Sequence, residues 1–125
     1  MPYAKSYDAV KIMDAVTFND EVTTAYSDEI DAEKFKKLTL YLAPTAAGGA
    51  GERSLTVTPQ YEPEADNWFD YDSVDDGYTP IVLDSITQKC VDIDCVGKNV
   101  RIKVEATGTT ADLTLTLTAW AQPWS

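Results

Sequence analysis

Residues 112–120 constrain the fold of this chain most strongly, because apolar residues and threonines alternate along them without a break. A period of two places the leucines on one face of a β-strand and the threonines on the other. The pattern therefore predicts a half-buried strand whose leucines face a core. The same alternation recurs at Leu38, Leu40 and Leu42, at Leu55 and Val57, and at Val100, Ile102 and Val104.

Several such segments separated by turn residues predict an all-β fold, an antiparallel β-sandwich or jelly roll of about eight strands with at most one short helix. We expect residues 25–125 to form this single domain. Residues 1–24 have no clean apolar period, which fits either an N-terminal arm that packs on a neighbouring subunit or an edge strand of the same domain. From the loops that join them, we expect residues 37–43 to pair with 53–61, and 99–107 to pair with the C-terminal strand.

The charge of the chain limits its partners. Asp and Glu number 21 against 10 Lys and Arg, which gives a formal net charge of −11. This charge repels nucleic-acid phosphates and anionic lipids, so neither is an expected partner. The longest apolar runs fall far short of the roughly 20 residues that span a bilayer, and the N-terminal residues lack the apolar core of a signal peptide. We expect the protein to be made in a cytoplasm.

The chain contains no histidine, which removes the commonest general base and the commonest transition-metal ligand. Catalytic triads and histidine-rich zinc sites are therefore excluded, and we expect a non-enzymatic protein without a cofactor. Cys90 and Cys95, if extended, lie about 16 Å apart on opposite faces of a strand. This separation is too long for a disulfide unless a tight turn lies between them.

Acidic residues concentrate in residues 62–76. They are Glu62, Glu64, Asp66, Asp70, Asp72, Asp75 and Asp76. Clustered carboxylates suit calcium, although their spacing does not match an EF-hand loop. The other interpretations are a solvated acidic face or a surface complementary to a basic partner.

Aromatic residues suggest two kinds of binding surface. Trp120 falls on the threonine face of its strand and Trp124 follows it, so both are candidate interface anchors. Trp68 with Tyr71 or Tyr41 on a sheet face predicts a sugar-stacking platform, as in β-sandwich carbohydrate-binding modules. The alternative is that these rings cover the ends of the sandwich.

Several segments together resemble small structural proteins of tailed bacteriophage virions. They are residues 27–31 (SDEID), 35–42 (FKKLTLYL), 54–61 (SLTVTPQY), Trp68 with Phe69, 100–108 (VRIKVEATG) and 113–117 (LTLTL). The resemblance covers roughly residues 27–120. It implies a jelly roll or sandwich that decorates or cements the capsid, or a component of the head-to-tail or tail apparatus.

A capsid-cementing role implies that the protein binds the major capsid protein and stabilises the head shell, on the surface of a virion assembled in the bacterial cytoplasm. Copies clustered about symmetry axes imply a homo-oligomer, with a trimer as the expected state. The residues that we expect at the interface are Tyr3, Tyr7, Ile12, Phe18, Trp120 and Trp124. The competing hypothesis is a carbohydrate-binding adhesion module that uses Tyr41, Trp68 and Tyr71.

Overall fold

The computed structural model describes residues 7–19, 21–48, 53–71, 81–84, 86–108 and 113–125. Within these ranges the chain forms ten strands and no helix. The strands are β1 (Val10–Phe18), β2 (Thr24–Tyr26), β3 (Ile30–Asp31), β4 (Lys37–Gly48), β5 (Arg53–Glu64), β6 (Asn67–Asp70), β7 (Ile81–Leu83), β8 (Lys89–Asp94), β9 (Asn99–Gly108) and β10 (Leu113–Trp124). The all-β class predicted from the alternation is confirmed.

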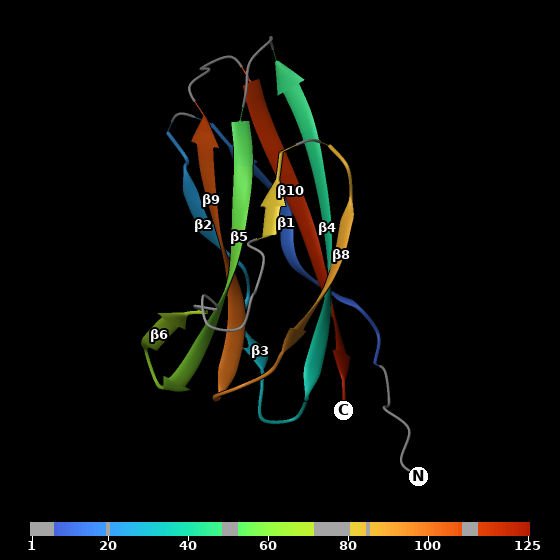
Figure 1. Cartoon of the computed structure of the whole chain (residues 1–125), viewed down its shortest axis with the longest axis vertical. Coiled ribbons are helices and arrows are strands. Elements are labelled where there is room, and N and C mark those ends of the chain that lie inside the picture. The colour runs from blue at the N-terminus through green and yellow to red at the C-terminus, as the bar shows by residue number, and fades with distance from the viewer. Residues whose placement is uncertain (1–6, 20, 49–52, 72–80, 85, 109–112) are drawn as a thin grey trace.

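Two antiparallel sheets pack against each other (Figure 1). Sheet A has the order β1-β10-β4-β8, and sheet B has the order β2-β9-β5-β6, with β3 also on β9 and β7 also on β5. Figure 1 views the two layers side by side, with β9 and β5 on the left and β10, β4 and β8 on the right. The architecture is a β-sandwich.

The core lies between the sheets and consists of the residues that the alternation points inward. From sheet A these include Leu38, Leu40, Leu42, Leu115, Leu117, Ala119 and Ala121, and from sheet B they include Leu55, Val57, Val100, Ile102 and Val104, all buried. Burying a leucine or valine of this kind stabilises the fold by roughly 1.5–3 kcal/mol. The regular alternation of β10 thus places one face of this strand in the core, and β10 lies between β1 and β4 in sheet A.

The segment without a clean apolar period contains β1, an edge strand of sheet A that pairs with β10. Its pairing has register irregularities between Lys11 and Met13 and between Met13 and Val16, and Ala15 has a positive φ of 47°. Each irregularity resets which side chains point inward, because an extra residue shifts the alternation. This is why the adjacent residues Ile12 and Met13 are both buried and why no period of two is visible in the sequence.

The expected pairings of successive long strands are wrong. β4 pairs with β10 and β8, whereas β5 pairs with β9, so that β4 and β5 lie in different sheets. In the same way β9 and β10 lie in different sheets. Alternation indicates that a strand has one buried face, but it does not indicate in which of two facing sheets the strand lies.

Candidate functional site

The outer face of sheet A carries a row of aromatic side chains. Trp120 of β10 is paired with Tyr41 of β4, and the row continues to Lys11 on one side and Cys90 on the other. Tyr41 is 37% exposed and Trp120 is half-buried, whereas the neighbouring residues in β10 are core residues. The strand that builds the core therefore also presents an aromatic surface to solvent.

Polar contacts hold Tyr41 and Trp120 in place. The Tyr41 hydroxyl donates to Oε1 of Gln122 at 2.6 Å. The Lys11 ammonium lies 5.7 Å from the centre of the Trp120 ring, a distance at which the cation is attracted to the ring face. Side chains that are already ordered lose less conformational entropy on binding, so these rings suit a recognition surface.

Trp124 lies four residues further along β10 than Trp120, and its ring is held by a hydrogen bond as well as by a nearby cation. Its indole N–H donates to Oγ1 of Thr39 at 2.9 Å, and the Thr39 hydroxyl donates to Asp92 at 2.6 Å. The Lys37 ammonium lies 5.2 Å from the Trp124 ring centre. This chain of contacts ties β10, β4 and β8 together across the outer face of sheet A.

A second pair of aromatic rings lies at the end of the sandwich where β10 finishes. Tyr7 and Phe35 form an edge-to-face contact with ring centres 5.1 Å apart, and we call them the terminal aromatic pair. The backbone holds both against β10, because Tyr7 N–H donates to the Pro123 carbonyl and Lys36 N–H donates to the Trp124 carbonyl. In Figure 1 the C-terminus lies at this end. Tyr7 is 39% exposed.

The structure divides the predicted interface residues. Trp120 and Trp124 lie on β10 and Tyr7 lies beside it, so that a role of these three at an interface stays a prediction, and Tyr3 lies outside the described residues. Ile12 and Phe18 are corrected. They are 4% and 0% exposed in the core of their own domain, because the register irregularities of β1 turn them inward. They cannot contact a partner while β1 remains paired.

The predicted sugar platform is not assembled. Tyr41 lies on the outer face of sheet A, whereas Trp68 lies on β6 of sheet B. Tyr71 packs edge to face on Tyr61, with ring centres 5.8 Å apart, and belongs to the margin of the core. Neither Tyr41 nor Tyr71 therefore shares a face with Trp68, so the predicted pairing of Trp68 with either ring is wrong. Sequence spacing does not indicate which sheet each strand joins.

Trp68 instead belongs to a network on the outer face of sheet B. The Arg101 guanidinium lies between two rings, 4.1 Å from the centre of Trp68 and 4.3 Å from that of Tyr26. Its Nε–H donates to Oε1 of Gln60 at 2.8 Å, which fixes the guanidinium plane. The sequence pattern gave no sign of this stack, because its members come from β2, β6 and β9.

Charged groups continue the network and shift one another's pKa. Asp70 accepts hydrogen bonds from Gln60 and from Lys103, each at 2.7 Å, and these bonds lower its pKa by stabilising the carboxylate. The same contact with Asp70 raises the pKa of Lys103. Glu62 accepts hydrogen bonds from the Asn99 amide and the Asp66 backbone N–H, which lower its pKa. The network pins β6 to β5 and β9.

These contacts bear on the acidic cluster. Within residues 62–76, the carboxylates of Glu62 and Asp70 are engaged with protein donors, whereas Asp72, Asp75 and Asp76 lie outside the described residues. Among the residues that the structure describes, no group of three or more Cys, Asp or Glu side chains is arranged to hold a metal ion. Calcium in residues 62–76 stays a prediction.

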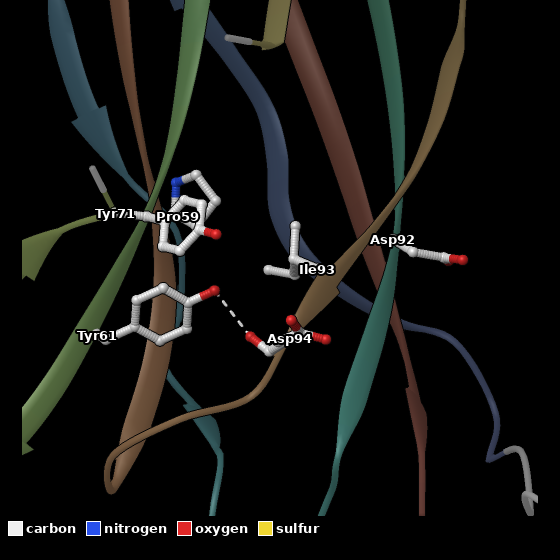
Figure 2. Close-up of a pocket in the computed structure, with 6 residues that line it drawn as sticks. All are labelled: Pro59, Tyr61, Tyr71, Asp92, Ile93 and Asp94. Carbon is white, nitrogen blue, oxygen red and sulfur yellow. Dashed lines mark hydrogen bonds between the residues drawn. The ribbon is translucent and has the colours of Figure 1, made fainter. Parts of the chain in front are cut away.

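A small cavity lies between the sheets, where β5 faces β8 (Figure 2). Its volume is about 110 Å³, and its lining includes Pro59, Tyr61, Tyr71 and Ile93. The Tyr61 hydroxyl crosses the gap and donates to the Asp94 carbonyl at 2.7 Å. In Figure 2 the Asp92 carboxylate points away from the tyrosines. The cavity is a gap of the packing that one hydrogen bond bridges, too small for a typical ligand.

A larger hollow opens on the outer face of sheet A, beside the Tyr41–Trp120 pair. Its volume is about 360 Å³, and it is lined by Tyr41, Leu42, Ala43, Gln88, Lys89, Cys90 and Trp120. Cys90 is exposed and forms no disulfide, and Cys95 is also free. Burial raises the pKa of Cys95 to about 11, with a further contribution from the Asp94 charge.

Comparison with known proteins adds no assignment to this geometry. No protein-family model matches the chain, and no curated protein matches it significantly. The described part of the chain contains no helix with the length and apolar character needed to cross a membrane.

Proposed function

We propose that this chain is a non-enzymatic structural protein of a tailed-bacteriophage virion, of the capsid decoration or cement type. The proposal rests on the resemblance given above, on the β-sandwich fold, and on the absence of histidine. The partner is the major capsid protein, and the place of action is the outer surface of the head shell. A role in the head-to-tail or tail apparatus is the alternative within the same class.

The observation that carries the proposal is the terminal aromatic pair. Tyr7 and Phe35 pack on each other rather than into the core, at the end of the sandwich that residues 1–6 adjoin in the sequence. Aromatic side chains at a surface contribute large contact areas and are frequent hot spots of protein interfaces. We assign this end to attachment, together with the neighbouring Trp124.

Attachment at this end explains cementing in thermodynamic terms. A protein that binds the assembled shell across a seam, and not the separate capsid subunits, stabilises the shell by mass action. The net charge of −11 favours a basic capsid surface and gives association a dependence on ionic strength. A trimer about a local symmetry axis would add avidity.

Co-sedimentation with empty capsids of the host phage tests the proposal. The variant Tyr7→Ala/Phe35→Ala is expected to bind at least about tenfold more weakly, since hot-spot residues each contribute more than about 1 kcal/mol. Removal of residues 1–6 is expected to weaken binding further while sparing β1. A longer deletion, through residue 20, would remove an entire strand of sheet A and is not informative.

Phe69→Ala is the matched control. Phe69 is an exposed aromatic residue of β6 on the opposite sheet, 61% exposed, and the variant is expected to bind capsids like the unaltered protein. Equal binding by the double variant and the control, with both proteins folded, would remove the terminal aromatic pair from the attachment site. Light scattering with size exclusion measures the oligomeric state, and a monomer at working concentration would contradict the trimer.

A further inference from the structure

The hollow beside Tyr41 and Trp120 has a structural cause. Ala43 follows Tyr41 on the same face of β4 and pairs with Thr118 of β10, so small side chains come directly after two large rings. The pairing of β8 with β4 reaches only from Asp94 at Lys37 to Lys89 at Leu42. The depression of about 360 Å³ therefore lies where large side chains give way to small ones and where the paired part of β8 begins.

The lining of the hollow combines ring faces with unused polar groups. The Gln88 side chain is exposed, and neither it nor the indole N–H of the half-buried Trp120 has a hydrogen bond with another described residue. Gln122 lies on the other side of the Tyr41–Trp120 pair and accepts the hydrogen bond of the Tyr41 hydroxyl, which orients that ring. Ring faces offer stacking, and the amide and indole groups offer hydrogen bonds.

The charges around the hollow favour a neutral ligand. Lys11 pairs with Asp14 at 3.5 Å, and the Lys89 ammonium is bonded to the Val82 carbonyl at 2.6 Å. Both lysines therefore already have partners within the protein, which makes them poor binding groups for an anionic ligand. The net charge of −11 on the whole chain further opposes an anionic ligand.

We propose that this hollow binds one pyranose ring of a neutral glycan. The C–H face of the sugar stacks on Tyr41 and Trp120, and its hydroxyls bond to Gln88 and the indole N–H. The volume is at the small end of the roughly 300–1,000 Å³ typical of ligand sites, which suits a single ring of a longer chain. The proposal does not depend on the capsid role, since it uses other residues.

An apolar anchor from a protein partner fits the same lining less well. Such a side chain would exclude water from the Gln88 amide and the Trp120 indole without replacing their hydrogen bonds, and an unsatisfied buried polar group is costly. Sugar hydroxyls replace those water molecules directly. The expected affinity of one shallow site is weak, with a dissociation constant of about 1 mM, and several copies on one particle would add avidity.

The test begins with an array of neutral and sialylated oligosaccharides, followed by NMR titration of the full chain with the methyl pyranosides of glucose, galactose and mannose. We expect saturable binding of at least one neutral sugar and a shift of the Trp120 indole N–H signal. Tyr41→Ala and Gln88→Ala are each expected to weaken binding, the former by at least about tenfold.

Ala43→Trp, which fills the hollow, is the decisive variant, and Ala47→Trp is its control. Ala47 lies on the same strand and face as Ala43, exposed, and about 13 Å further along at 3.3 Å per residue. Binding is expected to be lost in Ala43→Trp and kept within about twofold in Ala47→Trp. Gln88→Ala keeps the test open if Ala43→Trp fails to fold, because Gln88 is exposed and outside the strands.

Three results would overturn the proposal. They are an array without any neutral-glycan signal, sugar binding that survives Ala43→Trp in a folded protein, and loss of capsid binding in Ala43→Trp without any sugar binding by the unaltered chain. The last would identify the hollow as an anchor pocket for a protein. Capsid binding that fails while sugar binding persists would refute only the attachment proposal.

Discussion

Replacing Phe18 by alanine tests whether the N-terminal segment is part of the domain. Phe18 ends β1, pairs with Leu115 of β10 and is 0% exposed. Truncating a fully buried phenylalanine to alanine costs about 3–5 kcal/mol, as lost burial plus the cavity that remains. A domain of this size has a total stability of about 5–15 kcal/mol, so the loss removes a large share of it.

The expected change is readily measured. A change of 1 kcal/mol shifts the melting temperature by about 3–5 °C in a domain of this length, so Phe18→Ala is expected to melt roughly 10–25 °C lower. Urea unfolding followed by tryptophan fluorescence gives the same quantity as a shift of the midpoint at an unchanged slope. Val10→Ala, on the same strand but at a site 57% exposed, is the control and should change stability by less than about 0.5 kcal/mol.

The opposite result would refute the placement of β1. A free arm predicts that Phe18→Ala unfolds like the unaltered protein and loses only partner binding. An edge strand predicts the reverse order, in which stability falls first and binding falls only as a consequence of unfolding. Equal midpoints for Phe18→Ala and Val10→Ala would therefore restore the arm hypothesis.

Three further predictions concern acid stability, backbone strain and thiol reactivity. Because the pKa of Asp70 is lowered in the folded state, its contribution to stability is present above the pKa of the unfolded chain and is lost as the pH falls through the folded pKa. Urea midpoints of Asp70→Asn, measured between pH 2 and 7, should therefore depend less on pH than those of the unaltered protein. The difference should be less than about 1 kcal/mol, since the carboxylate is half exposed. Gly97→Ala should destabilise the chain by at least about 1–3 kcal/mol, because φ is +76° and an added Cβ would lie 2.7 Å from the Glu62 carbonyl oxygen; an unchanged midpoint would contradict that contact. A thiol reagent at pH 8 should label the exposed Cys90 quickly and Cys95 slowly, since the pKa of Cys95 is raised to about 11, and equal rates would contradict its burial.

The extent to which sequence predicts this fold follows from the regularity of each strand. β10 alternates without interruption, and the alternation predicts its buried residues Leu115, Leu117 and Ala119, although Leu113 at its start is only partly buried. β1 contains register irregularities, which local pattern cannot reveal, so its burial was left open between two alternatives. Strand pairing cannot be predicted from the local pattern either. Whether two successive strands form a hairpin in one sheet or cross to the other sheet depends on contacts between residues far apart in the chain.

For the candidate sites, too, the sequence predicts single residues but not which residues lie together. The sequence indicates Trp120 as a candidate because it falls on the threonine face of a regular strand, Trp124 because it follows Trp120, and Tyr7 because it is a large aromatic residue in a poorly patterned segment. The pairing of Trp120 with Tyr41, and the small Ala43 that makes room beside them, depend on the register of β4 against β10. That register is a tertiary property, since the two strands are separated by about half of the chain.

The register of β10 also decides whether the two proposed sites can act together. Trp120, which lines the hollow, and Trp124, beside the terminal aromatic pair, are four residues apart, which is about 13 Å along an extended strand. One pyranose ring is much shorter than that distance, so a sugar in the hollow would leave the terminal end uncovered. A particle-bound copy can then present its hollow to a glycan while the terminal end contacts the shell. Variants at one site should therefore leave binding at the other unchanged, because side chains this far apart without shared contacts contribute additively.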